Sequence, residues 1–197
     1  MTKEVVSLMS TQDRSGLYFE RKVRGAFMFL EKLGFAPVEA LSTLVRYRND
    51  DIDVDVHHGR QSYEVGAGVT GFGVRYAMSE VIRVTDPEAA KVYRNTVATT
   101  PAVVAEGLEE LSALMKRYGA AALRGDPQFF SALAKQREQW SEDYALDVLA
   151  DQLRPQADEA FRRGDYSTAA ELYGRIRVRL SPAETKKLAL AEDRSKR

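Results

Sequence analysis

The clearest pattern of hydrophobic and polar positions lies between residues 44 and 69. Apolar residues alternate with aspartates along Ile52–Val56, and a similar alternation returns along Tyr63–Val69. A period of two residues is typical of β-strands that bury one face. Gly59-Arg60 fits a two-residue turn between these runs, which predicts a β-hairpin.

The run before Asn49-Asp50 adds a third strand to this hairpin. A turn at that dipeptide places Arg46 opposite Asp53, and the turn at Gly59-Arg60 places Val54 opposite Val65. Opposite charges that face each other across a strand pair stabilise a sheet. Because a shift by one residue would bury the charges, the pattern predicts a well-specified three-stranded antiparallel meander.

Residues 15–33 have the spacing of an amphipathic helix that Gly34 would end. The apolar positions of its stripe are Phe19, Val23, Phe27, Leu30 and Leu33. Since the sheet has one apolar face that needs cover, we expect this helix to pack on it. Residues 76–84 fit either a short helix or a final strand, and the apolar run is too short to separate the two.

From residue 86 onward the chain reads as helical. Four dipeptides place a capping residue before a proline: Asp86-Pro87, Thr100-Pro101, Asp126-Pro127 and Ser181-Pro182. Such pairs are typical of helix starts, and Pro155 is expected to break or kink the helix around it. The segregation of strands and helices predicts an α+β fold, with a helix-and-sheet domain at residues 1–85 and a helical region at 86–197 that packs on it or extends from it.

Composition narrows the function classes. Lys+Arg and Asp+Glu are both 29, so composition does not favour nucleic-acid binding. The chain has no cysteine, which fits a reducing compartment. We expect no signal peptide and no membrane span, because the apolar runs are too short, and therefore a cytoplasmic protein.

The meander also carries the candidate site residues Asp53, Asp55, His57 and Glu64. Asp53, Asp55 and His57 share one strand face, but neighbouring Arg46 and Arg48 oppose metal binding there, so we expect no metal. Asp55 would face Glu64 without an arginine, which indicates either an acidic patch for a basic partner or a tolerated exposed repulsion.

The glycines at positions 66, 68 and 71 match the text of a dinucleotide-binding fingerprint. They fall inside a predicted antiparallel strand, without the helix and crossover that such a site requires. We therefore expect no cofactor. The two histidines both lie in the hairpin, and the common catalytic triads lack the necessary residues.

The segment GDYSTAAELYGRIRVRLSP, which follows Ala157, Ala160 and Phe161, resembles the second half of a tetratricopeptide repeat. Residues 157–182 would then form a helical hairpin with small residues at its contact. Ile176 stands where a small residue is usual, and Pro182 falls one residue late. The resemblance implies an adaptor that binds peptides through its helical tail, although such a groove needs stacked repeats.

The front of the chain, about residues 18–135, resembles small bacterial immunity proteins that are encoded beside polymorphic toxins. The resemblance rests on the order of parts: a helix that ends FLEKLGF, the strands VRYRNDDIDVDVHHGRQSYEVGAGV and a helical tail. It implies a non-enzymatic protein that binds a toxin domain and blocks it, and it identifies no functional residue. The charge pattern makes the acidic hairpin the candidate partner-binding surface. The alternatives are the peptide adaptor and an enzyme that uses Asp53, Asp55, Glu64 and His57.

Overall fold

The computed structural model describes residues 14–196, and the chain divides into two compact units, Met1–Ala134 (unit 1) and Lys135–Arg197 (unit 2). The sequence pattern predicted a boundary after residue 85. Residues 86–134 instead belong to unit 1, because their buried side chains Val104, Leu108 and Met115 join the same core as the sheet. The α+β class is confirmed, with an antiparallel sheet followed by a helical C-terminal half.

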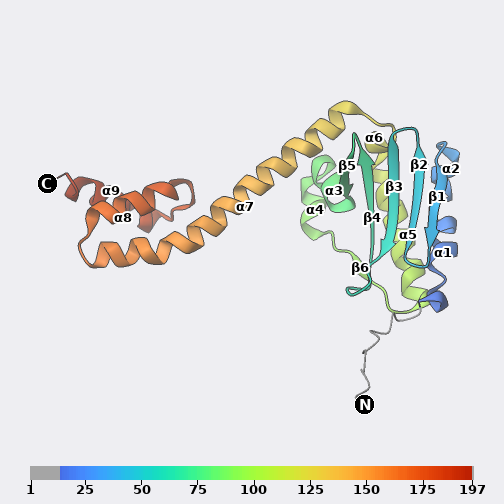
Figure 1. The fold of residues 1–197 in the computed structure, drawn as a ribbon, viewed down its shortest axis with the longest axis horizontal. Helices are drawn as coiled ribbons and strands as arrows, with labels where there is room; N and C mark the ends of the chain where they lie inside the picture. The colour runs from blue at the N-terminus through green and yellow to red at the C-terminus, as the bar shows by residue number, and fades with distance from the viewer. Residues whose placement is uncertain (1–13, 197) are drawn as a thin grey trace, which may run out of the picture. The chain divides into compact units, whose positions relative to one another are not determined.

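Unit 1 contains a six-stranded antiparallel sheet instead of three strands (Figure 1). Its strands are β1 (Ala36–Leu41), β2 (Leu44–Asn49), β3 (Ile52–His58), β4 (Glu64–Gly71), β5 (Val74–Ala77) and β6 (Thr96–Val97). The first five follow one another in order, and β6 pairs with β4. The additional strands lack a clean alternation in sequence, because β1 is an edge strand with a bulge and β5 and β6 are short.

Helices cover one face of this sheet, and α5 passes behind the strands in Figure 1. Unit 1 has α1 (Phe19–Ala26), α2 (Met28–Lys32), α3 (Met78–Thr85), α4 (Pro87–Val92), α5 (Pro101–Tyr118) and α6 (Ala120–Leu123), after a short 3-10 turn at Ser15–Leu17. The single helix expected for residues 15–33 is thus divided. Leu33 is 53% exposed, whereas the other four residues of its stripe are buried. Gly34 follows α2 with a φ of 89°.

The pairing of β2, β3 and β4 differs from the prediction. Val54 lies opposite Val69, and Arg46 lies opposite Asp55. The predicted neighbours Arg46–Asp53 and Val54–Val65 are wrong, because the chain turns at Asp50-Asp51 and through a longer loop between Gly59 and Tyr63. The register is displaced by an even number of residues, so each side chain still keeps its predicted face.

Unit 2 is formed by helices. Its elements are α7 (Pro127–Arg162), which begins in unit 1, α8 (Tyr166–Arg175), a 3-10 turn at Arg177–Arg179 and α9 (Pro182–Arg194). The four capping residues predicted before proline all accept hydrogen bonds from helix N–H groups. Pro155 does not end a helix, since α7 continues through it. The prediction that the back half is wholly helical missed β6.

Candidate functional site

The face of the unit 1 sheet that the helices leave uncovered carries a row of polar side chains. We call this surface the open face, and its polar members are Glu39, Arg46, Arg48, Asp53, Asp55, His57 and Arg75. They come from β1, β2, β3 and β5, and alternate with the buried core residues of the same strands. The open face therefore contains Asp53, Asp55 and His57 among these members. Glu64, the fourth candidate, projects from the same side of β4 as Gly66 but lies beside β6.

Asp55 is the centre of the open face. Arg75 donates two hydrogen bonds to its carboxylate, from Nε and Nη2, each 2.7 Å long. His57 donates a third from Nδ1 over 3.2 Å. Burial raises the pKa of Asp55, but the hydrogen bonds from His57 and Arg75 and the charge of Arg75 outweigh it and lower the pKa to about 2.

Two glycines of β4 make room for these contacts. Gly68 lies opposite Asp55, and the guanidinium of Arg75 crosses above it to reach the carboxylate. A Cβ atom at position 68 would stand 2.6 Å from Cζ of Arg75, and one at Gly66 would stand 2.7 Å from Nε2 of His57. The glycine spacing that resembles a nucleotide-binding motif therefore serves the packing of side chains across a strand.

The other charged pairs of the open face are also cross-strand pairs. Arg48 forms a bidentate pair with Asp53, with bonds of 2.6 and 2.8 Å, and this lowers the pKa of Asp53. Arg46 pairs with Glu39 at 2.7 Å. In each pair the cation is the more exposed partner: the side chain of Arg48 is 55% exposed and that of Asp53 is 18% exposed. A partner would therefore meet guanidinium groups first.

The predicted pairing of Asp55 with Glu64 is wrong. Asp55 does not face Glu64, because Gly68 lies opposite Asp55 and Glu64 lies opposite Val97 of β6. Asp55 is buried and is paired with Arg75, so the two carboxylates do not form one exposed surface. Arg75 was not among the predicted site residues, since its contact with Asp55 depends on the register of both β4 and β5.

This geometry limits acid/base chemistry on the open face. A carboxylate whose pKa is held at about 2 stays ionised near neutral pH and is a poor proton donor. Among residues 14–196, no group of His, Asp and Glu is arranged to hold a metal ion. The described helices also include none with the length and apolarity needed to cross a membrane.

His58, next to His57 in sequence, points to the opposite side and is buried. Its Nε2 donates to the carbonyl of Ala98 over 2.8 Å, and Arg14 Nη1 donates to its Nδ1 over 2.9 Å. Burial is the largest of the effects that lower the pKa of His58, and the positive charge of Arg14 acts in the same direction. This cluster connects the start of the described chain to the loop after β3 and to the chain after β6.

A hollow of about 740 Å³ opens at one end of unit 1. Turns of the sheet and the ends of α2, α5 and α6 form it, and the apolar side chains in its wall are Phe29, Leu33, Ile52, Phe72 and Leu123. Phe72 is exposed at a φ of 52°, a conformation unusual for a bulky residue, and its ring contacts Phe130. The volume of the hollow is in the range of small-molecule sites. Polar and charged residues complete its wall: Asn49, Asp50, Asp51, Lys116 and Arg124.

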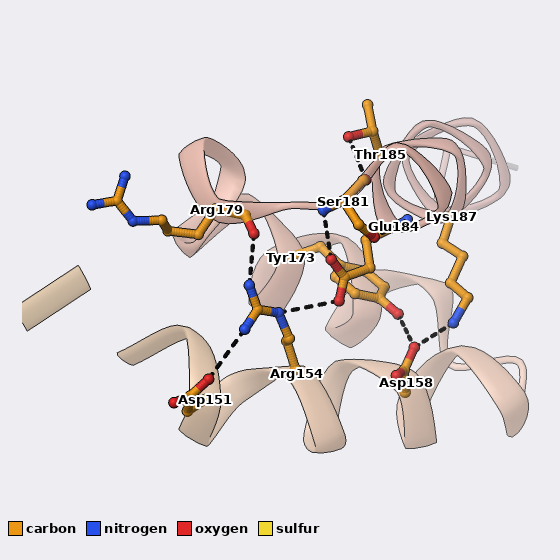
Figure 2. A network of polar contacts seen from close by, with 9 residues as sticks. All are labelled: Asp151, Arg154, Asp158, Tyr173, Arg179, Ser181, Glu184, Thr185 and Lys187. Carbon is orange, nitrogen blue, oxygen red and sulfur yellow. Dashed lines mark hydrogen bonds and ion pairs between the residues drawn. The ribbon is translucent and has the colours of Figure 1, made fainter. Parts of the chain in front are cut away.

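Unit 2 holds a second polar network, which Figure 2 shows. Tyr173 of α8 donates to Asp158 of α7, and Lys187 of α9 pairs with the same carboxylate at 2.5 Å. Arg154 of α7 donates to the carbonyl of Arg179 over 2.7 Å and pairs with Glu184 of α9. The network therefore ties the three helices of this unit together.

Comparison with protein-family models, with curated proteins and with solved structures finds no match. The resemblances to immunity proteins and to a tetratricopeptide repeat therefore stay predictions. We therefore infer the function from the geometry of the two units.

Proposed function

We propose that this protein acts without catalysis, by binding another protein through the open face of unit 1. The supporting observation is that Arg48, Arg75 and His57 are more exposed than the carboxylates they contact. Arg48 contacts Asp53, and both Arg75 and His57 contact Asp55. Arg48 is held in place by Asp53 through Nε and Nη2, and the further N–H groups of its guanidinium suit the recognition of a carboxylate. The partner surface that fits is therefore acidic, the reverse of the basic partner expected from sequence alone.

An immunity-type inhibitor of a bacterial toxin is the form of this function that we favour. Its support is the order of parts along the chain, and an arginine-rich face would suit an acidic patch on the toxin domain. Electrostatic complementarity of this kind mainly raises the association rate and the specificity. A peptide adaptor that uses unit 2 remains the alternative.

The test is affinity capture from the source organism with three forms of the full chain. The wild type should retain a partner that the Arg46→Gln/Arg48→Gln variant loses. Arg24→Gln is the matched control, because Arg24 is also a half-exposed, ion-paired arginine but lies on α1. Glutamine is used in place of an acidic residue so that no new negative charge is placed beside Asp53. Circular dichroism should show that the fold of each variant is unchanged.

The captured protein then tests the immunity form directly. Produced alone in a bacterial host, it should stop growth, and co-production of the wild-type chain should restore growth. Loss of capture in both variants, or in neither, would remove the open face from the interface. A partner that is harmless when produced alone would contradict the immunity form while leaving the binding proposal standing.

A further inference from the structure

One face of α7 presents large apolar side chains to solvent. From Lys135 to Val148, all within unit 2 and all described, no residue of the helix is buried. Trp140 is 62% exposed and Tyr144 is 70% exposed, and Val148 continues the row one turn later. Exposed aromatic residues at helical spacing are informative, because single exposed aliphatic residues are common but such rows are not.

Two charged residues extend this row at its ends. The positions Arg137, Trp140, Tyr144, Val148 and Asp151 are spaced by three, four, four and three residues, and we call them the aromatic face of α7. At 3.6 residues per turn these spacings keep all five within one narrow stripe. The stripe begins with a cation, ends with an anion and has its apolar residues between them.

The order of spacings is the same when it is read from either end. Tyr144 is the centre, Trp140 and Val148 lie four residues on each side, and Arg137 and Asp151 lie seven residues on each side. Two copies of such a stripe match each other when the helices run antiparallel about a two-fold axis at Tyr144. Each Arg137 would then face an Asp151, and each Trp140 would face the smaller Val148.

We propose that this chain pairs with a second copy of itself through the aromatic face of α7, with the two helices antiparallel. A two-fold interface is self-complementary, and this stripe fulfils that condition in both charge and side-chain size. Ser141 and Ala145 lie beside the stripe and are small, which allows the helix axes to approach. On its other side, Arg179 pairs with Asp143 and Asp147 within the same chain, so this flank is already organised.

The proposal is independent of the function proposed for the open face, which belongs to unit 1. Pairing of two chains also gives a role to the aromatic face of α7, which the predicted peptide adaptor would leave exposed. Helices in proteins are stabilised mostly by the packing of an apolar face, and no residue from Lys135 to Val148 is buried. Pairing would cover the apolar side chains of this helix and stabilise it.

The first test is the mass of the full chain in solution, measured by light scattering after gel filtration over a wide range of concentrations. The wild type should approach the mass of two chains at high concentration and that of one chain on dilution. Tyr144→Lys should give the mass of one chain throughout, because it places two like charges against each other at the axis. Glu138→Arg, an equal change of charge on an exposed residue away from the stripe, should leave the dimer unchanged.

A charge exchange tests the antiparallel register. Arg137→Glu alone and Asp151→Arg alone should each weaken the dimer at least tenfold, and the double variant should recover most of the loss. Asp151 also pairs with Arg154 in its own helix, so circular dichroism should confirm helix content in each variant. A wild type that is monomeric at every concentration, a dimer that survives Tyr144→Lys, or a double variant no better than the single ones would overturn the proposal.

Discussion

The two units stabilise their helices by different means. The core of unit 1 contains large side chains, among them Phe19, Phe27, Leu30 and Tyr47, which lie between the sheet and the helices. The main cluster of unit 2 has four alanines, Ala157, Ala160, Ala169 and Ala191, packed around Tyr173 and Leu188. Since the free energy of burial follows apolar area, unit 2 gains less of it from each buried residue.

Polar contacts have correspondingly different positions in the two units. In unit 1 the ion pairs between strands lie on the open face, on the side of the sheet opposite the core. In unit 2 the network of Figure 2 joins the three helices, and Asp158 receives bonds from both other helices. We infer that apolar burial dominates the stability of unit 1, and that unit 2 depends more on polar contacts between its helices.

The largest expected effect comes from removing the same side chain in each unit. Leu108→Ala in α5 should reduce the free energy of unfolding of unit 1 by about 4 kcal/mol, because large neighbours leave a cavity around the change. Leu188→Ala in α9 should reduce that of unit 2 by about 2 kcal/mol, near the low end for such changes. Hydrogen exchange measured by mass spectrometry in increasing denaturant assigns each loss to its unit. Equal costs would contradict the difference between the two cores.

The next prediction concerns the buried carboxylate of the open face. The folded pKa of Asp55 is about 2, below the ordinary aspartate value of 3.8. A lowered pKa means that the ionised form stabilises the fold above the unfolded pKa, and that this contribution is lost as the pH falls through about 2. Asp55→Asn should therefore reduce the stability of unit 1 by about 2 kcal/mol at pH 7.

The pH dependence separates this charge effect from a packing defect. The difference between wild type and Asp55→Asn in urea unfolding should shrink as the pH falls from 5 to about 2. Glu88→Gln removes an exposed carboxylate that pairs with Lys91 and should leave stability unchanged across the same range. A difference that is constant with pH would show that the charge of Asp55 does not stabilise the fold.

Sequence patterns predicted what depends on neighbours in the chain. The four capping residues before proline and the buried stripe from Phe19 to Leu30 follow from local spacing, and the structure contains both. The alternation along β3 gave the correct faces, because any even displacement of register preserves them. These features need no knowledge of where the chain turns.

The prediction of the candidate site failed because it depended on residues that are distant in the chain. The partner of Asp55 is decided by the length of two loops and by the position of β5, and these are not local properties. The predicted partners are displaced by two residues between β2 and β3 and by four residues between β3 and β4, and this changes every cross-strand neighbour. Gly68 was a usable signal, since a glycine within a strand indicates the close approach of another group, and here that group is Arg75.

Two replacements of glycine by alanine compare a crowded position in unit 1, Gly68, with an open position in unit 2, Gly174. Gly68→Ala should destabilise unit 1 by about 1 to 2 kcal/mol, because the new Cβ displaces Arg75 from Asp55. Gly174→Ala in α8 meets open space and should stabilise unit 2 by about 0.5 to 1 kcal/mol through helix propensity. Thermal unfolding followed by calorimetry measures both. Stabilisation by Gly68→Ala would show that Arg75 bonds Asp55 equally well from another position.

The smallest expected effect is the most selective, because it removes one hydroxyl from each unit. The hydroxyl of Tyr173 donates to Asp158, whereas that of Tyr47 is buried and bonds to no group within residues 14–196. Burial raises the pKa of both, that of Tyr47 to about 12. Tyr173→Phe should cost unit 2 about 1 kcal/mol, the usual contribution of one hydrogen bond.

Tyr47→Phe should leave unit 1 unchanged or stabilise it by up to about 1 kcal/mol, since an unpaired buried hydroxyl loses its contact with water on folding and gains nothing in return. The two variants have the same chemical change and nearly complete burial of the ring, so each serves as the control for the other. Hydrogen exchange in peptides of α8 and of β2 reports the two units separately. A loss at Tyr47 as large as that at Tyr173 would mean that unit 1 also depends on polar contacts inside its core.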